Sequence, residues 1–315
     1  MIVLGEALVD VVVGVREQVG GTLAMCAHAG GGPANVAVGL GRLGVPTQFA
    51  ARISRDRLGR FLREHLRASG VDLSLCVETA APATLAMVAL DAAGVAEYSF
   101  YLEGTADWAW EAAELPTNPH GVAVHTGSLA IGVDPGAALI ADWIAAQHAR
   151  GDVFVSLDPN IRPALVLGRP GYRERLEGLL AAANLVKVSE QDLEALEPGA
   201  DPLATAAEWA RRGPELVVLT HGARGATALR DGMGPRHCDA VPVTPVDTIG
   251  AGDAFMAGLL AFLAENGALS VGAARALEPA KLAAALRFAG AVAALTCSRA
   301  GADPPRREQL GLDGV

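Results

Sequence analysis

The chain has 315 residues, of which 51% are hydrophobic, and a formal net charge of −10 at pH 7. This size is sufficient for one large α/β unit, and the acidic balance argues against a nucleic-acid or membrane-surface binder, which normally carries a basic face. The four cysteines are widely spaced and form no CxxC pair, so neither a zinc site nor a disulfide framework is indicated, and we expect a reduced, cytoplasmic protein.

Short β-branched runs alternate with longer Ala- and Leu-rich segments along most of the chain. Strands are predicted at Ile2–Leu4, Thr47–Ala51, Val122–His125, Val153–Leu157, Leu185–Val188 and Leu216–Thr220. Helices are predicted between most of them, at Asn35–Leu43, Leu58–Ser69, Pro135–Arg150 and Arg173–Ala183. The alternation indicates an α/β fold in which helices cover both faces of a mainly parallel sheet.

One region interrupts this alternation. Thr84–Leu90 and Ala96–Leu102 are strand-like runs separated by Asp91–Gly94, a pattern typical of a β-hairpin. A further strand-like run, Val9–Val13, lies earlier in the chain. The hairpin is either a lid over a site or an extension of the edge of the main sheet, and the pattern leaves both open.

Neither a signal peptide nor a membrane span is predicted. The N-terminus reads as the strand Ile2–Leu4 followed by the acid Glu6, without the basic and apolar regions of a leader. The most apolar late stretch, Ala283–Cys297, is too short to cross a bilayer and contains Arg287.

The strongest chemical signal is the Gly-rich turn Asp247–Gly252, which leads through Asp253 into an apolar helical run. Glycines let backbone N–H groups converge, and a helix N-terminus adds partial positive charge. The segment therefore predicts a site for a phosphate or another developing anion. A carboxylate at this place either takes part in the reaction or caps the helix, and residue preference leaves both open.

A second Gly-rich helix start lies near the N-terminus. Gly30–Gly32 precede a predicted helix that carries Asn35 in its first turn, where the backbone can approach a ligand and the amide can bond to hydroxyl groups. The alternative is a tight turn with small residues for helix packing. The glycine spacing does not fit a dinucleotide-binding motif, and the Walker A and protein-kinase motifs are absent from the sequence.

These two segments resemble the paired signatures of the ribokinase-like (PfkB) family of carbohydrate kinases, GGxxAN at 30–35 and DTxGAGD at 247–253. The resemblance runs nearly end to end, and Asp158–Pro163 and Lys187–Glu190 are similar to the fructokinase and 2-keto-3-deoxygluconate kinase branch. It implies a three-layer αβα fold with a mainly parallel central sheet. It also implies a single kinase domain over residues 1–315, with a small β-sheet lid formed from about 9–25 and 84–105.

The resemblance also implies roles for individual residues. Asp253 would take the proton of a primary sugar hydroxyl, while Gly250, Ala251 and Gly252 would form an anion hole around the transferred phosphoryl group. The implied sugar contacts are Asp10, Gly31, Asn35, Tyr101 and Arg162. Two alternatives stay open: Arg162 forms an ion pair with Asp158, and the lid aromatic residues form a homodimer contact or the lid's own core.

The remaining implied residues serve ATP and its metal ions. The nucleotide contacts would be Lys187, Ser189, Thr220, Gly222 and Gly225, with a surface position as the alternative for Lys187. Asp192 would act on Mg²⁺ through water, although the family often has glutamate at this place. A monovalent cation such as K⁺ would use Asp247, Ile249, Thr296 and Gly301, where Pro305 replaces a side-chain hydroxyl found in some members.

We therefore expect an ATP-dependent sugar kinase that acts on a small-molecule sugar, with fructose as the leading substrate. A 2-keto-3-deoxygluconate kinase, which needs a basic site for the substrate carboxylate, and a ribose or nucleoside kinase are alternatives within the same fold. A catalytically silent sugar- or nucleotide-binding protein is the alternative from another class, and the intact Gly250–Asp253 turn argues against it.

Overall fold

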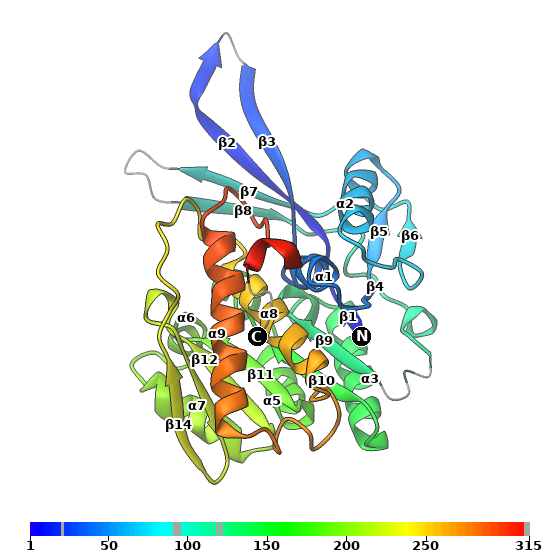
Figure 1. The fold of residues 1–315 in the computed structure, drawn as a ribbon. Coiled ribbons are helices and arrows are strands. Elements are labelled where there is room, and N and C mark those ends of the chain that lie inside the picture. Colours follow the sequence, from blue (N-terminus) through cyan, green and yellow to red (C-terminus); the bar gives the residue numbers. More distant parts are fainter. Residues whose placement is uncertain (20–21, 91–95, 118, 120–121, 312–315) are drawn as a thin grey trace.

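The computed structural model describes residues 1–19, 22–90, 96–117, 119 and 122–311. Its main sheet has eight strands in the order β14-β13-β12-β11-β10-β9-β1-β4 (Figure 1). The strands from β12 to β4 are parallel, and β13 and β14 are antiparallel additions at one edge. Their bounds are β1 (Ile2–Leu4), β4 (Gln48–Ala50), β9 (Ala123–Gly127), β10 (Phe154–Asp158), β11 (Leu185–Ser189), β12 (Leu216–Thr220), β13 (Ala226–Arg230) and β14 (Met233–Cys238).

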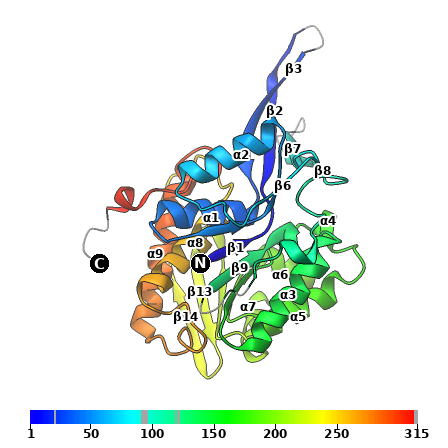
Figure 2. The ribbon, with the colours of Figure 1, turned by 90° about the vertical axis from the view of Figure 1, so that its right-hand side faces the viewer.

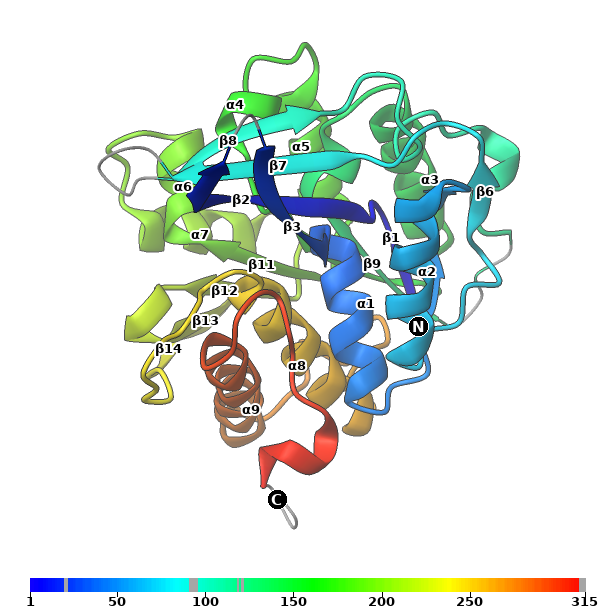
Figure 3. The same cartoon turned by 90° about the horizontal axis from the view of Figure 1, so that it is seen from above.

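Helices cover both faces of this sheet, as Figure 3 shows from above. One layer contains α1 (Gly32–Arg42), α2 (Arg57–Ala68), α8 (Ala251–Glu265) and α9 (Pro279–Cys297). The other contains α3 (Gly136–Arg150), α5 (Tyr172–Ala182), α6 (Glu190–Leu196) and α7 (Pro202–Arg211). Two hydrophobic clusters, one on each face, fill the space between the sheet and these layers. The predicted three-layer αβα fold with a mainly parallel sheet is confirmed.

A second, smaller sheet stands above the carboxyl edge of the first. Its order is β3-β2-β7-β8, and the β2–β3 hairpin projects from the body of the molecule (Figures 1 and 2). Its strands are β2 (Leu8–Val19), β3 (Thr22–Gly30), β7 (Leu85–Leu90) and β8 (Ala96–Tyr101). The predicted antiparallel pairing of the last two is confirmed, while their connecting turn at 91–94 lies outside the described residues.

The remaining elements are short. A two-stranded parallel sheet pairs β5 (Arg52–Ser54) with β6 (Val77–Thr79). One short helix, α4 (Pro163–Val166), follows β10, and 3₁₀ segments lie at η1 (Ala112–Glu114), η2 (Ser128–Ile131), η3 (Gly222–Arg224) and η4 (Arg307–Leu310).

All six predicted strands of the main sheet are present within two residues of their expected ends. The predicted helix at Asn35–Leu43 begins earlier, at Gly32, because Pro33 is well suited to the first turn of a helix. Strands β3, β13 and β14 were not predicted. β14 contains glycine and proline and is largely exposed, so it lacks the apolar alternation by which strands are found.

The late apolar segment differs from the expectation in length. Helix α9 begins at Pro279 and has 19 residues, so by length and composition it could cross a membrane. It packs against α8 and the β13–β14 edge, and 44% of its most apolar window is buried inside the protein. Its packing, rather than its length, is what identifies it as part of the outer helical layer.

Candidate active site

Two helix N-termini meet at the carboxyl edge of the main sheet. Helices α1 and α8 lie side by side, and a Cβ atom at Gly39 would come within 2.5 Å of the Ala257 Cβ, so this close approach requires glycine. Each helix follows a glycine with positive φ, 101° at Gly31 and 72° at Gly250, a conformation that favours glycine. The two Gly-rich segments of the sequence therefore form one site.

A cavity of about 740 Å³ opens at this site, between the main sheet and the second sheet. The second sheet contributes Val12, His28, Ala86, Val88 and Phe100 to its wall, and therefore covers the cavity instead of extending the main sheet. The predicted residues that line it are Asp10, Gly31, Asn35, Arg162, Asp247, Ile249, Gly250, Ala251, Gly252, Asp253 and Gly301.

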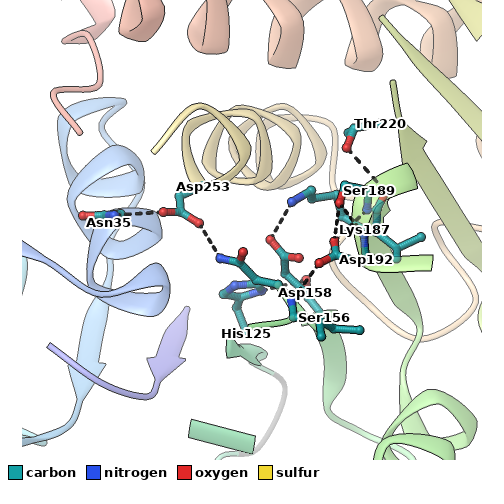
Figure 4. A network of polar contacts seen from close by, with 12 residues as sticks. Asn35, His125, Ser156, Asp158, Lys187, Ser189, Asp192, Thr220 and Asp253 are labelled. Carbon is teal, nitrogen blue, oxygen red and sulfur yellow. Dashed lines mark hydrogen bonds and ion pairs between the residues drawn. The ribbon is translucent and has the colours of Figure 1, made fainter. Parts of the chain in front are cut away.

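Asp253 lies in the first turn of α8, where its carboxylate is almost fully buried at the inner end of the cavity. Its Oδ2 accepts a hydrogen bond from Asn35 Nδ2 at 2.8 Å (Figure 4). Its Oδ1 accepts one from Asn160 Nδ2 at 3.3 Å. No side chain caps α8, so the alternative interpretation of Asp253 as a helix cap is wrong. The Ala251 N–H donates to the Thr248 carbonyl at 3.2 Å, and the next N–H groups of the first turn, which have no partner within the helix, are available for an anion.

Two of the predicted carboxyl groups of the cavity have raised pKa values. Burial raises the pKa of Asp253 to about 6, and the negative charge of Asp158 also raises it. The hydrogen bond from Asn35 lowers this pKa, but by less than burial raises it. Burial also raises the pKa of Asp10 to about 6, although the positive charges of Arg162 and His28 oppose it. Both groups therefore change charge in the range where a general base has to work.

Lys187 is the cation nearest to the start of α8. Its Nζ donates to Asp158 Oδ2 at 2.8 Å and would lie 3.1 Å from a Cβ atom placed on Gly252 (Figure 4). It is 3% exposed, so the alternative of a surface lysine is wrong. Burial opposes its charge, but the Asp158 and Asp192 carboxylates outweigh burial and raise the pKa of Lys187, which stays an ammonium group.

Asp192 and Ser189 form a capping box at the start of α6. Asp192 Oδ1 accepts from the Ile161 N–H at 2.7 Å, and Oδ2 accepts from the N–H and hydroxyl of Ser189. These bonds occupy three of the roughly four acceptor positions of the carboxylate. The loop before α4 and the start of α6 are thereby joined beside Asp158, whose Oδ1 is buried and has no hydrogen-bond partner.

Residues 1–309 match the model of the pfkB family of carbohydrate kinases. The chain belongs to that family. It is 39% identical over 263 residues to a fructokinase from Rhizobium leguminosarum bv. trifolii, covering 82% of this chain and 78% of the relative.

Solved structures show the same fold. A fructokinase from Xylella fastidiosa with bound ATP superimposes with a TM-score of 0.87 at 29% identity, over 98% of this chain and 96% of that one. A fructokinase double mutant from Vibrio cholerae O395, with fructose, ADP and potassium bound, superimposes with a TM-score of 0.82 at 26% identity, over 98% and 96% of the two chains.

The predicted nucleotide residues of the kinase lie beside the cavity, along the carboxyl ends of β11 and β12. Ser189 and Thr220 are neighbours in the parallel register. Gly222 and Gly225 both have positive φ, and a Cβ atom on Gly225 would lie 2.1 Å from the Cys238 carbonyl oxygen. Gly225 is thus a position that only glycine permits, and Figure 4 shows Lys187 between Thr220, at the end of β12, and Asp253 in the first turn of α8.

Asp247 joins two loops of the kinase. Its Oδ1 accepts from the Ile249 N–H at 3.0 Å and its Oδ2 from the Gly301 N–H at 2.8 Å, so the turn before α8 is held against the segment after α9. Thr296 is fully buried, and its hydroxyl donates to the Val292 carbonyl within α9. The Thr296 side chain therefore bonds within the helix, while the carbonyl of the next residue, Cys297, accepts from the Asp247 N–H at 3.2 Å.

The structure separates two predicted sugar contacts. Arg162 lines the cavity, and its Nη1 donates to Asn160 Oδ1 at 2.6 Å. Among the described residues, Asp158 forms its ion pair with Lys187 and not with Arg162. Tyr101 does not line the cavity and is 55% exposed, because neighbouring side chains on a strand face opposite ways and Phe100 is the one that faces inward. The side chain of Tyr98, another aromatic residue of β8, lies outside the described part of the chain.

The cavity residues that were not predicted include Glu6, His28 and Asn160. Glu6 is 1% exposed, its Oε2 accepts from the Ala130 N–H, and its Oε1 is buried without a hydrogen-bond partner. Burial raises the pKa of Glu6 to about 7. The sequence signal was an acid directly after an apolar strand; for His28 and Asn160 it was only proximity to the signature residues.

Proposed function

We propose that this kinase transfers the γ-phosphoryl group of ATP to the primary hydroxyl of fructose. The observation that carries this proposal is the Asp253 carboxylate, which faces the cavity beside the uncapped N-terminus of α8. In this position it orients the hydroxyl and accepts its proton, while the backbone N–H groups at Gly250–Gly252 and the buried Lys187 ammonium stabilise the negative charge of the moving phosphoryl group.

The charges of the cavity support a neutral sugar. Four carboxyl groups line it, those of Glu6, Asp10, Asp247 and Asp253, against the single guanidinium of Arg162 and the His28 ring. A keto-deoxy acid would bring a further negative charge into this surrounding, whereas sugar hydroxyls can donate to the carboxylates. We assign the sugar to Asp10, Gly31, Asn35 and Arg162, and leave Tyr101 out of direct contact because it faces away.

The nucleotide is assigned to the loop Thr220–Gly225 and to Ser189, with its phosphates directed past Lys187 toward Gly252. This is supported by Lys187, which pairs with β12 in the sheet and whose Nζ lies beside Gly252. Mg²⁺ takes oxygen ligands and usually reaches kinases bound to the nucleotide phosphates. The unpartnered Asp158 Oδ1, with Asp192 beside it, fits a metal-bound water there, and the ion would supply charge neutralisation of the triphosphate.

A monovalent cation, K⁺, is proposed at the turn that Asp247 holds. Backbone carbonyls near Ile249, Thr296 and Gly301 are hard oxygen ligands, although both Asp247 oxygens are engaged with backbone N–H groups. A titration of activity with KCl against NaCl tests this assignment.

Three further proposals concern the molecule as a whole. We propose a single kinase domain over 1–315 whose second sheet closes over bound sugar. The exposed apolar side chains Leu23, Met25 and Tyr101 on that sheet support a homodimer contact, which sedimentation would test. The four cysteines are free, which supports the cytoplasm as its compartment.

A panel of sugars with ATP and Mg²⁺, followed by ADP release, tests the function. The panel contains fructose, 2-keto-3-deoxygluconate, ribose and nucleosides, and we expect the highest kcat/KM for fructose. A preference for the keto-deoxy acid, ribose or a nucleoside would refute the fructose assignment, whereas the assignment as an ATP-dependent kinase would stand. Absence of sugar-dependent ADP release with every member would refute phosphoryl transfer to these acceptors.

A further inference from the structure

Asn160 lies in the loop between β10 and α4, with its backbone in the left-handed region at a φ of 40°. Ser128 is the other non-glycine residue with positive φ in the described part of the chain, and it lines the same cavity. Such conformations cost free energy in residues that carry a side chain, and they persist where the surrounding structure holds them. This placement points to a use for the Asn160 side chain that the family signatures leave unassigned.

Chemistry fixes which way the Asn160 amide faces. Its Oδ1 accepts from Arg162 Nη1 at 2.6 Å, and its Nδ2 donates to Asp253 Oδ1 at 3.3 Å. Arginine has donors and no acceptor, and an ionised carboxylate has acceptors and no donor. The amide oxygen therefore has to face Arg162 and the amide NH₂ group has to face Asp253.

The Asn160 amide is also confined by its neighbours. A Cβ atom on Gly32 would lie 3.1 Å from Asn160 Nδ2, so the start of α1 packs directly against the NH₂ group. On the other side of Asp253, Asn35 Nδ2 donates to the second carboxylate oxygen at 2.8 Å. The carboxylate is thus held between two amide donors that come from elements more than a hundred residues apart.

We propose that Asn160 is a positioning residue that keeps the Asp253 carboxylate ionised and correctly turned, and that connects it to Arg162 at the sugar site. This proposal rests on the function of Asp253 as the base. A donor to the ionised form of a carboxylate favours that form, and a fixed carboxylate leaves its remaining lone pairs directed into the cavity. Because Arg162 holds the other end of the amide, a sugar that engages Arg162 acts on the orientation of the base.

Asn160→Gly is the most direct test. Glycine adopts a φ of 40° without strain, so this variant removes the amide and keeps the loop conformation. We expect an unchanged melting temperature, a kcat about 10–100-fold lower, as for a misplaced catalytic group, and an acid limb of kcat/KM that moves to higher pH. Asn266→Gly, the same exchange at the exposed C-terminus of α8, is the matched control and should behave as the parent.

Asn160→Asp separates the two ends of the amide. Aspartate tolerates the left-handed region and still accepts from Arg162, but it presents an oxygen to Asp253 where the NH₂ group stood. We expect kcat to fall at least as far as in Asn160→Gly, with a larger shift of the acid limb, because two carboxylates in contact disfavour ionisation. Parent activity in Asn160→Asp would mean that only the Arg162 bond matters and would overturn the proposal.

The double variant Asn160→Gly, Asp253→Asn distinguishes this proposal from the assignment of the base. If Asn160 acts through Asp253, adding Asn160→Gly to Asp253→Asn should lower kcat no further. Losses that multiply, or an Asn160→Gly variant that raises KM for fructose with kcat and pH profile unchanged, would refute the positioning role while Asp253 stands. Parent-like kcat in Asp253→Asn alone would instead refute the base, and the proposal would fall with it.

Discussion

Asp253→Asn is the sharpest test of the mechanism, and the structure gives it a definite stability signature. Two NH₂ groups donate to the Asp253 carboxylate, but asparagine offers a single acceptor oxygen, so one bond is lost at about 1 kcal/mol. Against this, the pKa of Asp253 is about 6 instead of 3.8, which corresponds to about 3 kcal/mol of destabilisation once the buried group is ionised.

The sign of the pH dependence follows from this raised pKa. The unfavourable term is absent below about pH 4, grows as the pH rises through the folded-state value of about 6, and is complete above it. Asp253→Asn should therefore be at least as stable as the parent at pH 8, and relatively less so at pH 5. Thermal melting of both proteins at the two pH values measures this difference.

Asp253→Asn should lower the catalytic rate even though it does not lower the stability at pH 8. An asparagine cannot accept the hydroxyl proton, and loss of a general base typically costs about 10²–10⁴-fold in rate, or roughly 3–5 kcal/mol of barrier. In the parent, kcat/KM should rise with pH through about 6 as Asp253 ionises. Steady-state ADP release at saturating ATP and fructose, with nucleotide titration on the same preparation, measures the loss.

The control is Asp142→Asn, the same exchange at an exposed position on α3, which should leave kcat and melting unchanged. A folded Asp253→Asn variant that binds ATP and keeps kcat within about threefold of the parent would refute the reasoning, because base loss costs far more. In that case the carboxylate only fills the space between its two amide donors.

Three further outcomes are expected. Asp10→Ala should raise KM for fructose about 10–100-fold, as expected when hydrogen bonds to a charged group are lost; unchanged sugar kinetics would remove Asp10 from the site. Glu6→Gln should raise the melting temperature more at pH 8 than at pH 5, because a pKa of about 7 instead of 4.5 costs up to about 3 kcal/mol once Glu6 is ionised, and only a small part of that cost is present at pH 5; equal shifts at both pH values would contradict this. Gly250→Ala should lower the urea midpoint more than Gly267→Ala, since both have positive φ but only Gly250 would press a Cβ atom against Ala302, at 2.5 Å; equal losses would exclude the clash.

The main sheet was predictable because its parallel strands are buried on both faces and therefore read as continuous apolar runs, as in Leu216–Thr220. The same rule explains the failure at β3. Its side chains from Leu23 to His28 are exposed, so no buried face imposes a period on the sequence. A strand that pairs through its backbone alone leaves little trace in the order of its residues.

Some residues of the candidate site could be predicted from the sequence and others could not. The glycines and Asp253 are recognisable because a helix start that binds an anion needs those residue types at adjacent positions. Lys187 was predicted as a site residue, but its burial and its ion pair were not. Its partner Asp158 lies on another strand, 29 residues away in the sequence. Asn160 was not predicted as a site residue because its proposed role depends on a left-handed backbone and on a bond to Asp253, which is distant in the sequence, as well as on its bond to Arg162.

The charges around Asp253 differ between its two sides, and this difference would allow a neutral sugar and an anionic triphosphate to bind next to each other. On the side proposed for the sugar, the carboxyl groups of Glu6 and Asp10 can accept hydrogen bonds from hydroxyl groups and disfavour an anion. On the side of Gly252, the Lys187 ammonium and the uncapped helix N-terminus attract one. Asp253 lies at the boundary, so a triphosphate and a neutral sugar are each favoured on one side of the base. A positive charge in place of Asp10 would reduce the difference in charge between the two sides and leave Lys187 and the start of α8 unchanged. The sugar assignment can therefore be tested separately from the assignment of phosphoryl transfer.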